Sequence, residues 1–116
     1  MNGFLNVLKP PGMSSHDVVS FLRRKTGVKT GHTGTLDPGA AGVLVLAQGK
    51  ATKLASFVSG SIKKYRAELK LGKATDTGDS TGNIIREKPV PSLKPVQLNY
   101  LCSVFTGRRE QKPPMY

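Results

Sequence analysis

The chain has 116 residues and a formal net charge of +11, from 18 lysines and arginines against 7 aspartates and glutamates. This length fits one small domain, and no apolar run approaches the ~18 residues of a membrane span. One cysteine, Cys102, excludes an internal disulfide, and with only two histidines a Cys/His zinc site is not expected. We therefore expect no metal, no secretory signal and a reducing, cytoplasmic environment.

The first half of the sequence predicts two strands and two helices around a glycine-rich loop. Ser14 and Asp17 have the spacing of a capping box, and Gly27 has the character of a helix C-cap. In chain order we expect a strand over residues 3–8, a helix from Ser14 to about Thr26, a loop over 28–42, a strand over 43–46 and a helix from Thr52 to about Val58.

The second half begins with the clearest strand pattern in the sequence, because polar and apolar residues alternate throughout residues 64–71. We expect a strand over 64–71, a polar turn region over 72–82, a strand over 83–87, a proline-marked linker over 89–95 and a helix over about 98–105. Strands and helices are mixed without regular βαβ alternation, which predicts an α+β fold.

The positive charge is spread along the whole chain. Residues 1–64 carry nine basic and two acidic side chains, and the remainder carries nine and five. A basic folded body favours a polyanionic partner, most often a nucleic acid, through phosphate contacts and counterion release. The charge alone leaves open a protein that is merely cationic.

Two short motifs resemble known binding or catalytic sites. The "QGKAT" stretch lacks the upstream glycine and the following serine or threonine of a phosphate-binding P-loop. Asp76-Thr77-Gly78 matches the aspartic-protease signature, which would require a dimer to supply the second aspartate. An Asx-type turn built by aspartate and threonine side chains is the favoured interpretation, and the spacing fails for an EF-hand loop.

Asp37 is the only carboxylate between Asp17 and Glu68. An aspartate before a proline in a loop is usually a turn residue. However, the glycines around it permit close approach of a ligand, basic neighbours favour an ionised carboxylate, and an ionised carboxylate can act as a nucleophile. One carboxylate without a metal partner does not suit two-metal phosphodiester chemistry, so the pattern favours chemistry on a sugar or base.

The segment that holds Asp37, "GHTGTLDPGAAGVLVL", resembles the catalytic motif of the TruB-type tRNA pseudouridine synthases. Three further segments resemble family motifs in the same order. "LNVLKPPGMSSHDVV" is similar to the Lys-Pro-x-Gly-x-x-Ser motif, "KKYRAELKLGKATDTGDSTG" to the tyrosine-bearing strand and its turn, and "QKPPMY" to the segment that runs on into Ser-Ala-x-Lys. The resemblance covers nearly the whole chain.

The resemblance implies an isomerase that converts uridine 55 in the T loop of tRNA to pseudouridine after flipping the base, without a cofactor, on a mixed, mostly antiparallel sheet with flanking helices. It makes Asp37 the nucleophile. Tyr65 would stack on the target base, His32 would help to hold the opened T loop, and Asp79 would shape a turn near the site. Candidate substrate contacts are Gly34 and Thr35 in the loop and, for phosphates, Lys9, Lys64 and Arg66.

The family's catalytic domain continues beyond Tyr116 into an arginine that pairs with the aspartate, more of the sheet and an RNA-binding domain. The resemblance therefore implies that residues 1–116 are the N-terminal part of the catalytic domain and are inactive alone. A non-catalytic RNA-binding module and the guide-RNA-dependent branch of the family remain as alternatives, although "GHTGTLDP" favours the bacterial stand-alone branch. We expect tRNA as partner, no membrane and no obligate protein partner.

Overall fold

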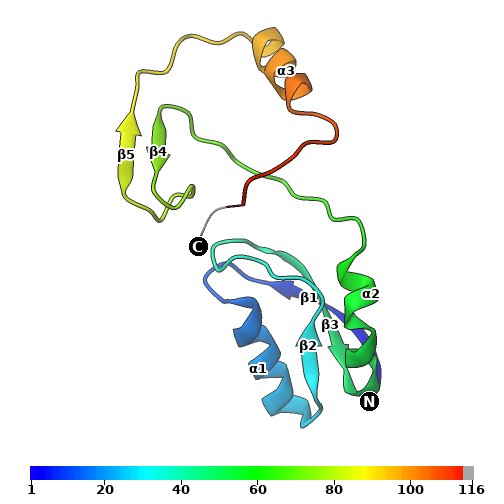
Figure 1. Ribbon diagram of the computed structural model, residues 1–116. Coiled ribbons are helices and arrows are strands. Elements are labelled where there is room, and N and C mark those ends of the chain that lie inside the picture. The colour runs from blue at the N-terminus through cyan, green and yellow to red at the C-terminus, as the bar shows by residue number, and fades with distance from the viewer. Residues whose placement is uncertain (114–116) are drawn as a thin grey trace. The chain divides into compact units, whose positions relative to one another are not determined.

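A computed structural model describes residues 1–113. The chain divides into two units, Met1–Tyr65 and a second that begins at Arg66 (Figure 1). Each unit combines helices with antiparallel strands, which confirms the α+β class. Every strand pairing within residues 1–113 is antiparallel, so the mixed component predicted for the sheet is not seen there.

The first unit is built on a three-stranded sheet in the order β1-β3-β2. All seven residues of β1 pair with β3, and β2 covers the opposite edge of the last part of β3, from Leu46 to Gln48. Its elements are β1 (Gly3–Lys9), α1 (Ser15–Thr26), β2 (Thr30–His32), β3 (Gly42–Gln48), the 3-10 helix η1 (Gly49–Leu54) and α2 (Ala55–Ser59).

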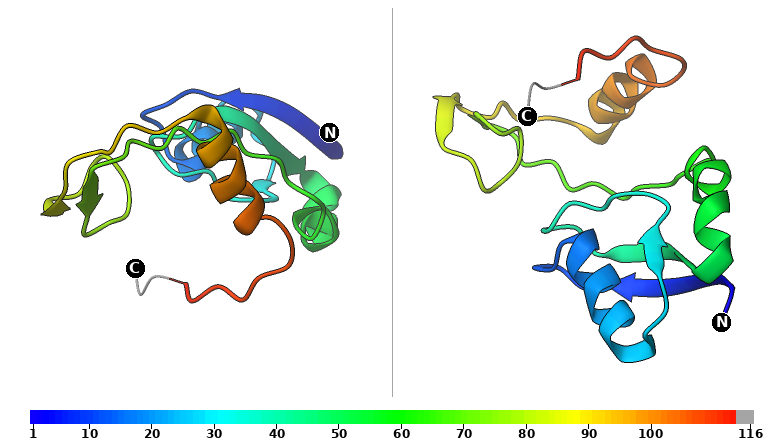
Figure 2. Two further views of the ribbon diagram at one scale, coloured as in Figure 1. Left: turned by 90° about the horizontal axis from the view of Figure 1, so that it is seen from above. Right: turned by 60° about the horizontal axis from the view of Figure 1, so that its bottom comes forward.

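Helix α1 packs on one face of this sheet and forms the core with it (Figure 1 and Figure 2). Val18 and Val19 of the helix meet Leu44 and Leu46, which share a face of β3 because side chains alternate along a strand. The partly buried side chains packed against this cluster are Val7, Met13, Leu22 and Leu36. Because Leu36 lies in the loop that holds Asp37, the packing of the core extends into that loop.

The ends of α1 match the sequence prediction. The Ser14 hydroxyl accepts a hydrogen bond from the Asp17 amide at 3.1 Å, and the Asp17 carboxylate accepts one from the Ser14 amide at 2.9 Å. Gly27 adopts φ +67°, a left-handed conformation that glycine takes without strain, and donates to the Arg23 carbonyl. The capping box and the helix bounds are thereby confirmed.

The second unit contains a short hairpin and one helix: β4 (Lys73–Thr75), β5 (Ile84–Glu87) and α3 (Pro95–Val104). Strands β4 and β5 are antiparallel, and an ion pair of 3.3 Å joins Lys73 to Glu87 across them. None of the residues of α3 is buried. Within residues 1–113, no helix is long and apolar enough to cross a membrane.

Four predicted elements need correction. The loop expected over 28–42 contains β2, and the turn region over 72–82 contains β4. The second helix begins as a 3-10 helix at Gly49, and Thr52 lies within it, donating to the Gly49 carbonyl rather than capping a helix. Residues 64–71 form no strand and are exposed, because a strand needs a partner and none pairs with this segment in the described chain.

Candidate active site

Asp37 lies in the loop between β2 and β3. Hydrogen bonds to β3 hold this loop where it leaves β2. The Thr33 amide and hydroxyl both donate to the Val45 carbonyl, at 2.9 and 3.1 Å. Within the loop, the Ala40 amide donates to the Asp37 carbonyl at 3.0 Å and closes a turn over Pro38. Asp37 is exposed, and its carboxylate makes no hydrogen bond or ion pair within residues 1–113.

The residue before Asp37 is held by a buried serine. The Ser15 hydroxyl donates to the Leu36 carbonyl at 3.0 Å and accepts from the Leu36 amide at 2.8 Å. Ser15 is only 2% exposed, and Leu36 also packs against the core. Both backbone groups of Leu36 are therefore satisfied by one side chain from the first turn of α1.

The residue after Asp37 is held by a buried lysine. The Lys9 ammonium donates to the Pro38 carbonyl at 3.2 Å, to the Pro10 carbonyl at 3.0 Å and to the Met13 carbonyl. Lys9 is 0% exposed. The prediction of Lys9 as a phosphate contact is therefore wrong, because its ammonium is enclosed and its donors are used by backbone oxygens.

Gly12 makes a second hydrogen bond to the Pro38 carbonyl. Its amide donates to the same carbonyl at 2.7 Å, and its φ of +89° favours glycine at this position. The Lys-Pro-x-Gly-x-x-Ser residues Lys9, Gly12 and Ser15 thus fix the backbone on both sides of Asp37. We call these three residues with Leu36 and Pro38 the Asp37 clamp.

Three other predicted residues lie in or beside the same loop. His32 ends β2 opposite Leu46, and its Nδ1 atom is buried without a hydrogen-bond partner among the described residues. Gly34 lies close under Lys63, since a Cβ atom there would stand 3.2 Å from the Lys63 Cε. Thr35 is exposed in the loop. His32, Gly34 and Thr35 therefore lie in the same segment as Asp37, between β2 and β3 or at the end of β2.

The remaining predicted residues lie outside the loop that holds Asp37. Tyr65 ends the first unit in an irregular segment with 69% of its surface exposed, and Lys64 beside it is exposed as well. Arg66 and Asp79 belong to the second unit. Part of the "QKPPMY" motif, residues 114–116, lies outside the described residues.

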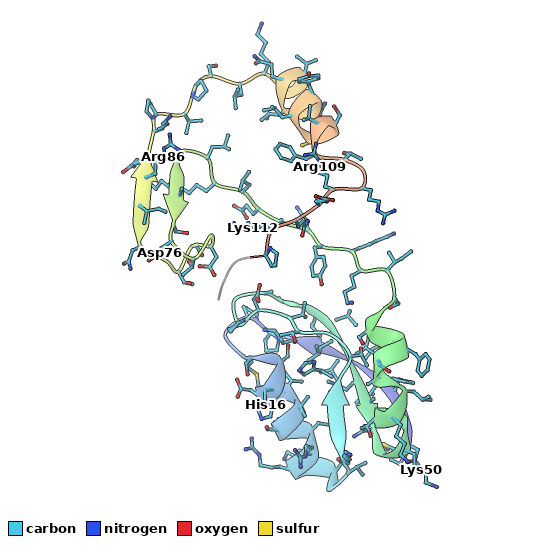
Figure 3. All side chains as sticks on the ribbon, in the orientation of Figure 1. His16, Lys50, Asp76, Arg86, Arg109 and Lys112 are labelled. Carbon is cyan, nitrogen blue, oxygen red and sulfur yellow. The ribbon has the colours of Figure 1, made fainter. Side chains whose placement is uncertain are left out.

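The aspartates of the β4–β5 loop build a turn, as predicted. Asp76, labelled in Figure 3, accepts from the Asn83 amide at 2.9 Å and from the Asn83 side chain at 3.3 Å. Asp79 accepts from the Thr81 hydroxyl and amide and from the Thr77 hydroxyl, and these hydrogen bonds, those from Thr81 foremost, lower the pKa of Asp79. Asp76 is thus committed to a turn, which disfavours the protease alternative.

Sequence reasoning missed two residues that shape the loop, Ser15 and Thr33. The signal for Ser15 was present, because it is the serine of the Lys-Pro-x-Gly-x-x-Ser motif, but its partner lies 21 positions away. No signal marked Thr33 beyond its place among glycines. Within residues 1–113, no group of three or more His, Cys, Asp or Glu side chains is arranged to hold a metal ion.

Comparison of the sequence with known families assigns this α+β chain to one of them. Residues 21–116 match the model of the TruB family pseudouridylate synthase, N-terminal domain, and the chain belongs to this family.

Curated relatives extend the similarity to the whole chain. A protein of Symbiobacterium thermophilum named tRNA pseudouridine synthase B is 53% identical, over 99% of this chain and 39% of its own length. Proteins of the same name from Pelotomaculum thermopropionicum and Alkaliphilus oremlandii are 56% and 54% identical, over 99% and 100% of this chain and 37% and 39% of their own. The chain thus spans about two-fifths of the length of these relatives.

Proposed function

We propose that the protein to which this chain belongs isomerises uridine 55 in the T loop of tRNA to pseudouridine, with Asp37 as nucleophile. The observation that carries the proposal is an exposed carboxylate whose two neighbours in the chain are both anchored, while the carboxylate itself has no partner within residues 1–113. Family membership and relatives named tRNA pseudouridine synthase B supply the reaction and the RNA class.

The reaction suits a single positioned carboxylate. The bond from N1 of the uracil to the ribose C1′ breaks, a bond from C5 to C1′ forms, and the C5 proton is released while N1 gains one. Nothing is oxidised or reduced, so the step as written requires no cofactor. An aspartate at neutral pH is an ionised nucleophile. Attack on C1′, attack on the base and assistance to glycal formation are three routes open to it.

The substrate must bring its uridine out of the stacked loop, at a cost of a few kcal/mol. We propose that Tyr65 stacks on the flipped base and that His32 helps to hold the opened T loop. Thr35, next to Gly34, and Asp37 are both exposed, which supports a close approach of RNA to this loop. Lys64 and Arg66, both exposed, are proposed to contact phosphates, and Asp79 to maintain the β4–β5 turn.

The test is the variant Asp37→Asn in the intact protein, with Glu87→Gln as the control. Tritium release from tRNA carrying 5-tritiated uridine reports turnover. We expect Asp37→Asn to abolish release while tRNA affinity stays within about tenfold, or about 1.4 kcal/mol. Glu87→Gln removes one exposed carboxylate from β5 and should release tritium at the normal rate. Substantial release by Asp37→Asn would overturn the nucleophile assignment, whereas no release by the wild-type protein would favour a module that only binds RNA.

We also propose that residues 1–116 alone are inactive. The second unit exposes large apolar side chains, among them Ile85, Tyr100 and Phe105, each at 67–71% exposure. Surfaces of this kind usually mark an interface. The tritium assay on a sample confirmed by intact mass as 116 residues decides the point. Multiple turnover by that species would show that these residues suffice for catalysis.

A further inference from the structure

A hollow of about 790 Å³ lies at the end of the first unit where α1 terminates. The left-handed Gly27 turns the chain back from α1 into β2, and the space between the last helical turn and the start of the strand stays open. The residues that line it are Ser20, Arg23, Arg24, Gly27, Val28, Lys29 and Thr30. Three of these seven residues, Arg23, Arg24 and Lys29, are cationic.

No ion pair within residues 1–113 neutralises the positive charge of this hollow. The first unit has only two acidic side chains, Asp17 and Asp37, and the single ion pair within residues 1–113 joins Lys73 to Glu87. Cations in a last helical turn interact favourably with the helix dipole, which accounts for the presence of Arg23 and Arg24. The helix dipole does not account for Lys29, which lies outside α1 and lines the hollow directly before β2.

The hollow is remote from Asp37. Ser15, at the start of α1, belongs to the Asp37 clamp, and Arg23 and Arg24 follow eight and nine residues later, or about 12–14 Å along the helix. The seven residues of β3 likewise span about 20 Å between the two ends of the sheet. A ligand in the hollow is therefore not the nucleotide that reacts at Asp37.

We propose that the hollow binds the sugar-phosphate backbone of the substrate RNA several nucleotides away from the modified uridine. The inference rests on the proposed function, since it assigns a second contact to the same RNA. Two arginines and a lysine around one concavity suit this ligand, because guanidinium groups bind phosphate oxygens through paired donors. Contacts of this kind position an RNA without reading its sequence, so the hollow contributes affinity and not the chemical step.

The test variant, R23Q/R24Q/K29Q in the intact protein, removes the three positive charges of the hollow. The control variant, K70Q/K88Q/K94Q, removes three positive charges from exposed positions of the second unit. The probe is an unmodified tRNA transcript. We expect the hollow variant to bind at least tenfold more weakly than the control, with kcat unchanged at saturating RNA. Its log–log salt slope should be shallower by about 2, at roughly 0.7–0.9 for each lost phosphate contact.

A second measurement does not depend on the variants folding. Bound transcript should shield the Lys29 amine of the wild-type protein from an acylating reagent more strongly than it shields Lys88. Equal binding by both variants, or equal labelling of Lys29 with and without RNA, would overturn the hollow as a contact. If wild-type protein instead binds RNA through Lys29 but releases no tritium, the proposed function fails while the contact stands.

Discussion

Ser15→Ala tests whether the Asp37 clamp governs catalysis. The change removes one hydroxyl and leaves both the Leu36 amide and the Leu36 carbonyl without a partner. Each buried group left unsatisfied costs about 1–3 kcal/mol, and because Leu36 is partly exposed and some water can enter, we expect a loss of about 2–4 kcal/mol in the free energy of unfolding. That is a large share of the ~5–15 kcal/mol typical of a domain.

The effect on turnover follows from the position of Leu36 next to Asp37. A displacement of about 1 Å at a reacting group can cost on the order of 10²-fold in rate. We therefore expect kcat for tritium release to fall by about that factor at a temperature and urea concentration where the variant is still folded. Urea unfolding gives the stability, and amide exchange of Leu36 reports whether the clamp has opened.

Ser14→Ala is the matched control, because it makes the same chemical change one residue earlier. The Ser14 hydroxyl bonds only to Asp17, so the variant should lose the usual N-cap contribution of about 1 kcal/mol and keep its kcat within about threefold. A normal kcat for Ser15→Ala would refute the argument that the clamp positions Asp37. An equal loss of kcat in Ser14→Ala would attribute the effect to α1 as a whole.

Two further predictions concern Lys9 and Asp17. Lys9→Met should lower the free energy of unfolding by about 2–4 kcal/mol, because three backbone carbonyls lose a charged donor. In filter binding, the log–log salt slope of this variant for RNA should match that of wild type. Loss of a phosphate contact would instead reduce the slope by about 0.7–0.9. Hydrogen bonds from Ser14 lower the pKa of Asp17 below 3.8, so its contribution to stability is present above that pH and is lost as pH falls through the folded-state pKa. Exchange of α1 amides should therefore show an advantage of wild type over Asp17→Asn at pH 6 that shrinks as the pH falls below the ordinary range of an aspartate. An advantage that stays constant in acid would contradict this prediction.

Local patterns predicted the elements whose determinants lie within a few residues of each other. The capping residues Ser14 and Asp17 and the terminating Gly27 are all adjacent to α1, and its bounds were predicted correctly. The alternation in 64–71 is an equally clear local pattern, yet the segment is not a strand. Alternation specifies which side chains would share a face, but the hydrogen bonds of a strand come from another segment, and the described chain supplies none.

Lys9 shows the same limit at the level of the site. In the sequence it is one cation among eighteen, and a solvated side chain or a phosphate contact is the natural interpretation. Its burial depends on the Pro38 carbonyl, 29 positions away, together with two carbonyls of its own turn. A buried ammonium is tolerated only where such acceptors converge, and no local pattern reveals that convergence.

The contacts of the clamp explain why two motifs separated in sequence act together. Asp37, the proposed nucleophile, needs a fixed position, and contacts to its chain neighbours fix it without using any acceptor site of its carboxylate. Here the fixed points are the backbone groups of Leu36 and Pro38, held by Ser15, Gly12 and Lys9. Because the protein restrains Asp37 through its neighbours, the carboxylate is positioned by the fold while its oxygens stay accessible from solvent.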